Sequence, residues 1–321
     1  MIDWDVAKPS QLKALLAQHG FSFKKQLGQN FLIQPHILDQ IVEAAELTKE
    51  DGAFEVGPGA GVVTQRLARA AKRVVSVEKD RALTPVLADS LAACANVEVL
   101  YEDVLNLHLS DVWQRYADCR SVSMVANLPY YITTPILFHV LESGVSLRNV
   151  VIMVQREVAE RMAAAPGSKD YGVLSIAVQY RAQVEKVTTV PPSAFLPPPN
   201  VESQVVRLRI REQPAVAVAD EKTFFRVVHA AFSMRRKTLL NTLSAGMGAS
   251  KAQVARWLEE AGVDGRRRGR HSPWLNMHGC PIPGLPGGES SDFSSVGIYC
   301  SQAVEGGDAQ WIGCFTAPAA V

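Results

Sequence analysis

The sequence predicts a doubly wound α/β fold of the Rossmann-like type, followed by a small helical domain. Three observations support this prediction. Short apolar segments alternate with amphipathic stretches from residue 52 to about residue 210, a glycine-rich loop closes the first apolar segment, and the pattern becomes helical after Asp220. Strand–helix–strand repetition is typical of a parallel sheet with helices on its faces.

Five short apolar segments are expected to form strands. They span residues 53–56, 73–78, 97–103, 122–126 and 149–154. Sheets of this kind bind ligands beyond the carboxyl ends of their strands, so the residues found there are candidates for a site. Those candidates are Gly57, Glu78, Asp103 and Asn127.

Two further strands are expected at residues 183–190 and 203–210, separated by a cluster of prolines. Proline has no amide proton to donate to a ladder, so residues 191–199 are expected to form an ordered loop. Asp220 is a plausible helix N-cap, and apolar side chains then recur at helical spacing until Gly262. The expected parts are an amino-terminal segment over 1–32, a catalytic domain over 33–215, a helical domain over 216–268 and a poorly ordered tail over 269–321.

Composition gives the broad class. The chain has 321 residues, of which 47% are apolar and 20% charged, enough for one large core and an appended domain. No apolar run approaches the ~20 residues that cross a bilayer, and the start lacks signal or transit features, so a cytoplasmic protein without membrane contact is expected. Five cysteines without a CxxC pair or zinc-spaced histidines favour neither a metal site nor a disulfide framework.

The net charge of +1 carries no information about nucleic acid, but the charge is unevenly distributed. Residues 207–256 contain ten Lys or Arg against three acids, which indicates a local basic surface. Taken alone, this run is as well explained by an ordinary solvated face.

The glycine loop comprises Glu55, Gly57, Gly59 and Gly61, with Pro58 between the first two glycines. Glycines let backbone amides approach a ligand without a Cβ in the way. The spacing departs from the G-x-G-x-x-G of dinucleotide binders, which favours S-adenosylmethionine over NAD. The alternative of a nicotinamide oxidoreductase also lacks a convincing hydride-site histidine.

Two acids follow the loop. Glu78 ends the second strand, where an acid can accept both ribose hydroxyls; the alternative is a surface acid at a strand end. Asp103 lies one strand further on and can accept from the adenine amine of the cofactor. Its alternative, a helix N-cap, has equal weight.

The run Asn127-Leu128-Pro129-Tyr130 places an amide acceptor, a stiff turn and an aromatic face at the end of a strand. Such a corner can hold a flat base by its exocyclic amine, with Tyr130 stacked on the ring. With the glycine loop, it predicts methyl transfer onto a nucleobase nitrogen. The alternative for Tyr130 is a half-buried core aromatic.

Several motifs in this order resemble those of the ribosomal RNA small-subunit adenine N6,N6-dimethyltransferase family, over about residues 20–268. They are residues 24–32, 55–61, 127–130, 195–201 and 232–240. The resemblance implies an S-adenosylmethionine-dependent enzyme that dimethylates two adjacent adenosines in a hairpin loop near the 3′ end of 16S rRNA. Its implied partner is the immature 30S subunit, and its implied state is a monomer.

The resemblance also implies roles for single residues. Asn30 and Leu32 would line the methionine end of the cofactor with Gln29 adjacent, and Asn127 would border both cofactor and target. The remaining cofactor residues would be Glu55, Gly57, Gly59, Gly61, Glu78, Asp103 and Val104. The catalytic corner would be Asn127, Leu128, Pro129 and Tyr130, and the RNA phosphates would be contacted by Arg235, Arg236 and Lys237.

Three points stay open at this level. Tyr131 and the turn at 155–157 have no firm role, and the polar loop at 166–172 is a weak candidate for closing over substrate. The family pattern is lost after Gly269, where the composition suggests a non-homologous extension. The alternatives in function are a large-subunit rRNA adenine methyltransferase of the antibiotic-resistance type and a non-catalytic ribosome-assembly factor that binds RNA.

Overall fold

The computed structural model describes residues 4–23 and 29–269, which group into two compact units. The first unit comprises the chain up to residue 163 together with residues 178–214, and the second comprises residues 164–177 and the chain from residue 215 onward. The expected tail and part of the 24–32 motif lie outside the described residues.

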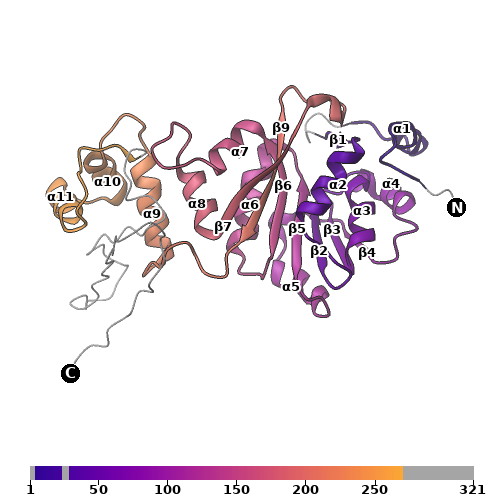
Figure 1. Cartoon of the computed structure of the whole chain (residues 1–321), viewed down its shortest axis with the longest axis horizontal. Helices are drawn as coiled ribbons and strands as arrows, with labels where there is room; N and C mark the ends of the chain where they lie inside the picture. Colours follow the sequence, from indigo (N-terminus) through magenta and orange to yellow (C-terminus); the bar gives the residue numbers. More distant parts are fainter. Residues whose placement is uncertain (1–3, 24–28, 270–321) are drawn as a thin grey trace, which may run out of the picture. The chain divides into compact units, whose positions relative to one another are not determined.

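The first unit is built on a seven-stranded sheet with the order β4-β3-β2-β5-β6-β9-β7 (Figure 1). Neighbouring strands from β4 to β6 are parallel, whereas β9 and β7 are antiparallel. The α/β prediction is therefore confirmed. The strands are β2 (Gly52–Val56), β3 (Arg73–Val77), β4 (Val97–Leu100), β5 (Val122–Asn127), β6 (Asn149–Gln155), β7 (Ala182–Val190) and β9 (Ser203–Ile210).

One strand is shorter than the sequence indicated. β4 ends at Leu100, and the chain then turns into the short 3₁₀ helix η3 (Val104–Asn106). The turn occurs because the Asp103 side chain accepts a hydrogen bond from the Leu105 amide, which caps η3. The expected extension of this strand to residue 103 is therefore wrong.

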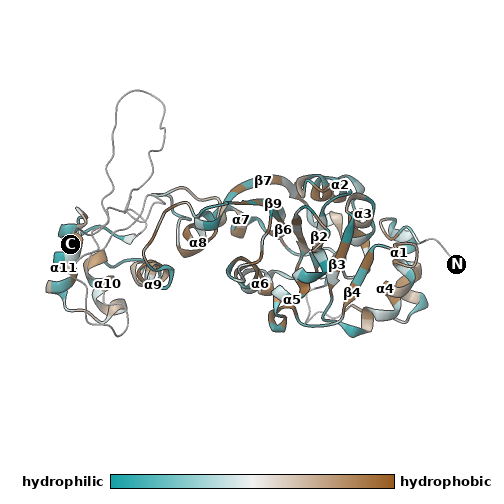
Figure 2. Cartoon of the chain, turned by 90° about the horizontal axis from the view of Figure 1, so that it is seen from below, coloured by the Kyte–Doolittle hydropathy of each residue, from teal (hydrophilic) through white to brown (hydrophobic). Residues whose placement is uncertain are grey.

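Helices cover both faces of the sheet. Figure 2 shows α2 and α3 on one side of the strands and α5 and α6 on the other. The helices that begin in this unit are α1 (Pro9–Gln18), α2 (Pro35–Ala44), α3 (Val62–Ala70), α4 (Thr84–Ser90), α5 (Leu109–Trp113), α6 (Tyr130–Glu142) and α7 (Arg156–Met162). Short 3₁₀ turns occur at η2 (Arg81–Leu83), η4 (Gln114–Tyr116) and η5 (Pro192–Ala194).

Helix α1 was not expected from the sequence. Leu12, Leu15 and Leu16 are buried in the main core. Their i, i+3, i+4 spacing after Pro9 at the first helical turn is a signal that could have found the helix. The His19 ring nitrogen lies 2.9 Å from an Asp89 carboxylate oxygen, so the end of α1 is held beside α4.

Two sequence motifs meet in a short ladder. Strand β1 (Phe31–Leu32) pairs antiparallel with β8 (Phe195–Leu196), and the Ile33 amide donates to the Ala194 carbonyl at 2.8 Å. The expectation of a loop without ladder pairing over 191–199 is therefore wrong at Phe195–Leu196, where neither residue is a proline and both can pair. This ladder fastens the amino-terminal motif to the first unit.

The second unit is helical, and its helices are α9 (Glu221–Phe232), α10 (Leu239–Met247) and α11 (Lys251–Glu260). Helix α8 (Val173–Arg181) contains the point where the two units divide. Asp220 is the N-cap of α9, because its carboxylate accepts from the Thr223 amide at 2.7 Å. The loop at 166–172 contributes Tyr171 to the core of this unit, where its ring packs edge-on against Phe232.

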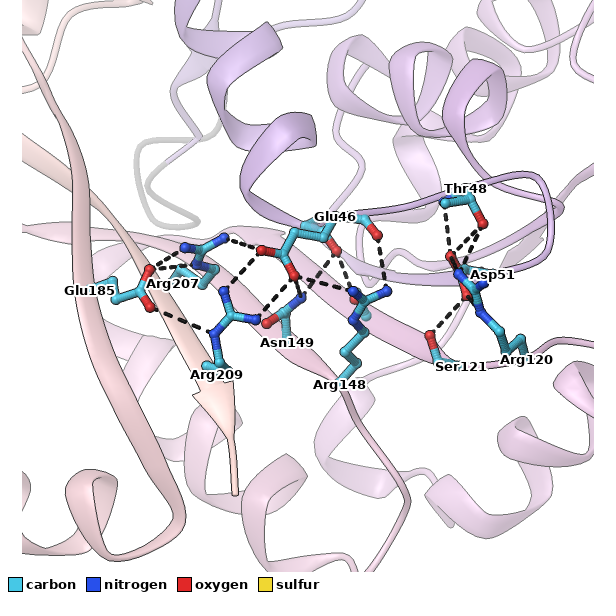
Figure 3. Close-up of polar contacts among 12 residues, drawn as sticks. Glu46, Thr48, Asp51, Arg120, Ser121, Arg148, Asn149, Glu185, Arg207 and Arg209 are labelled. Atoms are coloured by element: carbon cyan, nitrogen blue, oxygen red, sulfur yellow. Dashed lines mark hydrogen bonds and ion pairs between the residues drawn. The ribbon is translucent and has the colours of Figure 1, made fainter. Parts of the chain in front are cut away.

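An ion-pair network occupies the amino ends of the parallel strands (Figure 3). Glu46 accepts hydrogen bonds from Arg207 at 2.7 Å, Arg209 at 2.9 Å and Arg148 at 3.3 Å. Glu185 on β7 pairs with Arg207 and Arg209 from the other side. Ligands of such sheets bind beyond the carboxyl ends of the strands, at the opposite end from this network. The network therefore stabilises the fold and is not part of a ligand site.

Candidate active site

A cavity lies at the carboxyl ends of β2, β3 and β5, and it collects most of the residues expected from the sequence. The expected residues that line it are Gln29, Asn30, Leu32, Gly57, Gly59, Glu78, Asp103, Val104, Asn127, Leu128, Pro129 and Tyr130. Glu55 and Gly61 are not among the lining residues. Gly57, Glu78, Asp103 and Asn127, which lie at or just beyond the carboxyl ends of four different strands, thus line one cavity, as the topology rule predicts.

Glu55 points into the core beneath the glycine loop. One of its carboxylate oxygens accepts from the Thr64 hydroxyl at 2.7 Å and from the Ser76 hydroxyl at 2.6 Å. Burial raises the pKa of this carboxyl to about 7. Glu55 therefore connects β2 with α3 and β3, and its contacts support the loop from below.

The three glycines of the loop all have positive φ angles. Gly59 and Gly61 also allow the loop to approach two different neighbours closely. A Cβ on Gly61 would lie 2.8 Å from the Ser90 hydroxyl, so this glycine permits close packing at the start of α3. A Cβ on Gly59 would lie 2.8 Å from the Phe31 ring. The loop and the amino-terminal motif therefore touch, and any side chain at Gly59 would separate them.

Glu78 follows β3 and is 7% exposed. Its two carboxylate oxygens accept from the Asp80 amide at 2.8 Å and the Gly59 amide at 3.1 Å. Burial raises the pKa of the Glu78 carboxyl, while these amide bonds oppose the rise. The buried position excludes a plain surface acid, and a carboxylate has further lone pairs for the hydroxyls of a ligand.

Asp103 is the N-cap that one of the two sequence interpretations expected. One oxygen caps η3, and the other accepts from the Lys79 ammonium at 2.7 Å. The Lys79 hydrogen bond holds the pKa of this carboxyl below its usual value. Asp103 also lines the cavity, so it is a cap and a wall residue at once.

The corner at the end of β5 is fixed on two sides. The Asn127 side-chain nitrogen donates to the Asn30 carbonyl at 3.4 Å. The side-chain oxygen of Asn127 is therefore the atom of this amide that can accept a hydrogen bond from a ligand. Pro129 is the N-cap of α6, and Tyr130 is the first residue of that helix. The half-buried Tyr130 ring lines the cavity, while its hydroxyl lies 2.6 Å from the Ser203 hydroxyl. Burial raises the pKa of Tyr130.

Among the wall residues that the sequence did not single out are Phe31, Lys79 and Phe195, and Tyr131, which had no firm role from the sequence, lines the cavity as well. Phe31 and Phe195 are both buried. In the β1–β8 ladder, Phe31 lies opposite Leu196 and Phe195 lies opposite Leu32. Both residues belong to motifs that resemble the family, at 24–32 and 195–201. Their place in these motifs was the signal that could have identified them as wall residues. Tyr131 is 63% exposed, unlike its neighbour Tyr130.

In the helical unit, Arg235, Arg236 and Lys237 are exposed in the loop between α9 and α10. The Leu239 amide donates to the Arg267 carbonyl at 2.7 Å, which brings the exposed run 266–268 beside this loop. These three further arginines were not singled out from the sequence. Two basic segments therefore adjoin on one unit.

Across residues 4–23 and 29–269, no helix is long and apolar enough to cross a bilayer. The same residues contain no group of three His, Cys, Asp or Glu that could hold a metal ion.

Comparison with known proteins decides the family. The family described as Ribosomal RNA adenine dimethylase matches residues 20–269. The chain belongs to this family. The Ribosomal RNA small subunit methyltransferase A of Geobacillus thermodenitrificans (strain NG80-2) is 51% identical over 269 residues, covering 83% of this chain and 92% of the relative. The protein of the same name from Anoxybacillus flavithermus (strain DSM 21510 / WK1) is 49% identical, with 83% and 91% covered.

Solved structures of rRNA methyltransferases share the fold. A dimethyladenosine transferase from Plasmodium falciparum is 28% identical with a TM-score of 0.59, covering 73% of this chain and 82% of its own. The 23S rRNA methyltransferase ErmE is 26% identical with a TM-score of 0.60, covering 77% and 98%. The fold is therefore similar to both branches, while the sequence is much closer to the small-subunit proteins.

Proposed function

We propose that this chain transfers methyl groups from S-adenosylmethionine to N6 of two adjacent adenosines in small-subunit ribosomal RNA, in the hairpin loop near the 3′ end of 16S rRNA. The observation that carries the proposal is the convergence of the glycine loop and the Asn127–Tyr130 corner on one cavity. The small-subunit relatives at about half identity favour this substrate over the large-subunit alternative.

The wall residues suit S-adenosylmethionine. Glu78 would offer its buried carboxylate to the ribose hydroxyls, and Asp103 with Val104 would lie at the adenine. Gln29, Asn30 and Leu32 would line the methionine portion. When bound, this cofactor supplies a methyl group on a positively charged sulfur.

The corner residues would activate the target amine. The lone pair of an adenine amine is delocalised into the ring and is a poor nucleophile. The Asn127 side-chain oxygen and the Leu128 carbonyl would accept hydrogen bonds from the amine, localising the lone pair and aiming it at the methyl group. No general base is needed, since the amine becomes acidic only as it is alkylated. Glu55, despite its pKa near 7, is engaged beneath the loop.

Tyr130 would hold the target ring. Base–aromatic stacking contributes ~1–3 kcal/mol, which helps to offset the few kcal/mol required to extract a base from its neighbours. The stacked ring would then present its amine to Asn127. Substrate binding and chemistry would thus share one corner.

The proposal is tested by incubating the protein and labelled S-adenosylmethionine with small and large ribosomal subunits that lack the modification. Label in N6,N6-dimethyladenosine of the small-subunit RNA is expected. Label only in large subunits would support the resistance-type alternative. Particle binding without any label would support a non-catalytic assembly factor.

The Lys79→Ala variant is expected to bind S-adenosylmethionine about two- to threefold more weakly, because an exposed charge pair contributes little. Lys79 orients the Asp103 carboxylate through their 2.7 Å contact. Isothermal titration calorimetry measures the affinity. Lys72→Ala is the matched control, because Lys72 pairs with Asp118 at the opposite edge of the sheet. Equal affinities in wild type and Lys79→Ala would contradict this role for Lys79.

Removing the charges of Arg235, Arg236 and Lys237 together should weaken RNA binding and flatten its salt dependence. Each lost phosphate contact lowers the slope of log K against log salt by roughly 0.7–0.9. Filter binding to the 16S hairpin between low and moderate salt measures this slope. The control is the double variant Lys72→Ala/Arg73→Ala, whose charges pair with Asp118. An unchanged slope in the triple variant would show that these residues do not contact phosphates.

We also propose that the protein works as a monomer in the cytoplasm on the immature 30S subunit, as its resemblance to the small-subunit dimethyltransferases implies. Sedimentation of the protein alone tests the monomer. Comparing naked 16S rRNA with assembly intermediates in the labelling assay tests the required particle.

A further inference from the structure

The hydroxyl of the wall residue Tyr130 is held by a residue outside the cavity. Its oxygen lies 2.6 Å from the Ser203 hydroxyl oxygen, and either group can be the donor. Ser203 is fully buried at the start of β9 and does not line the cavity. The two residues are separated by 73 positions in sequence.

Ser203 is a rigid anchor because the sheet holds it on both sides. It lies opposite Gln155 on β6 and opposite Val190 on β7. The residue before it is fixed as well, since the Glu202 carbonyl accepts from the Arg156 amide at 3.1 Å. The residue after it, Gln204, accepts from the Thr189 hydroxyl at 3.0 Å.

The Tyr130 side chain is therefore held at both ends. Its backbone opens α6 directly after Pro129, and its hydroxyl is tied to the sheet. A ring fixed in this way loses no further rotamer freedom when a base stacks on it. Tyr131, the next residue on α6, is 63% exposed.

We infer that Ser203 is a positioning residue for methyl transfer, which locks the Tyr130 ring so that the stacked adenine presents its amine to Asn127. This inference rests on the proposed function. Ser203 acts only through the Tyr130 hydroxyl, so it contributes to capture and alignment of the base. Binding of the cofactor is independent of it.

A double-mutant cycle of Ser203→Ala and Tyr130→Phe tests the inference, because phenylalanine keeps the ring and removes only the hydroxyl. Each single variant should lower kcat/KM for small-subunit particles by roughly three- to tenfold, the range of one hydrogen bond. The double variant should be no slower than the slower single variant. The affinity for S-adenosylmethionine should stay unchanged in all three.

Ser123→Ala is the matched control, since Ser123 is also buried in this sheet and donates to the Ala45 carbonyl at 2.9 Å. It should change thermal stability about as much as Ser203→Ala without the loss of kcat/KM. Ser203→Thr, which keeps the hydroxyl, should restore part of the lost rate.

Four outcomes would overturn the inference. Losses that multiply in the double variant would show that Ser203 and Tyr130 act separately. An equal rate loss in Ser123→Ala would show a general packing effect. A normal rate in Ser203→Ala beside an active wild type would refute the inference alone, whereas an inactive wild type would refute the proposed function with it.

Discussion

Replacing Asn127 by alanine is expected to abolish methylation of small-subunit particles while leaving cofactor binding measurable. The substitution removes the side-chain oxygen that would accept from the target amine, and the contact to the Asn30 carbonyl with it. Removing one preorganised group from the reacting centre typically costs about 10²- to 10³-fold in rate. The glycine loop, Glu78 and Asp103 stay in place, so S-adenosylmethionine should still bind.

Single-turnover labelling with saturating particles measures the rate, and calorimetry measures cofactor affinity in the same preparation. Asn96→Ala is the matched control. Its side-chain amide also donates to backbone carbonyls, those of Ala68 and Ala71, but away from the cavity. Turnover at the wild-type rate in Asn127→Ala would remove Asn127 from the catalytic assignment.

The elements of this fold that depend on the sequence of a few neighbouring residues could be predicted from the sequence. Short apolar segments and their alternation with helices indicated the seven strands of the large sheet, and Asp220 indicated the start of α9. The carboxyl-end rule then brought Gly57, Glu78 and Asn127 to one cavity. Each of these inferences uses a neighbourhood of a few residues, or a rule that depends only on strand direction.

The parts that depend on long-range contact were not predictable. Glu55 was expected to contact the cofactor because it precedes the glycine loop. The spacing of the glycines, however, does not determine on which face of β2 the Glu55 side chain lies. The partners Thr64 and Ser76 become visible only when α3 and β3 are packed. Phe31 pairs with Leu196, and Tyr130 contacts Ser203. Both contacts join residues far apart in the sequence, so no local sequence pattern predicts them.

Glu46→Gln is expected to destabilise the first unit by about 2 kcal/mol, between the values for exposed and buried ion pairs. Glu46 accepts from three arginines and has a side-chain exposure of 28%. Its neutral replacement leaves Arg207 and Arg209 with Glu185 as their remaining acidic partner and removes the acidic partner of Arg148. Glutamine keeps the shape and the left-handed φ of 52°, so the change isolates the charge.

Urea unfolding followed by circular dichroism measures the difference in the free energy of unfolding. Glu98→Gln is the matched control, because Glu98 forms a single pair with Arg115 and is 45% exposed. The control should change stability by no more than about 0.5 kcal/mol. A loss in Glu46→Gln as small as in the control would mean that the network of Figure 3 contributes no more than one surface pair.

The pH dependence of this loss has a definite sign. The Arg209 hydrogen bond holds the pKa of Glu46 below its ordinary value of 4.5. A carboxyl whose folded pKa is lowered contributes its full stability above the unfolded pKa, and loses it as pH falls through the folded pKa. The difference between wild type and Glu46→Gln should therefore be constant above about pH 5.5 and shrink below pH 4.5. A difference that grew on acidification would contradict the assignment of Glu46 as the ionised centre of this network.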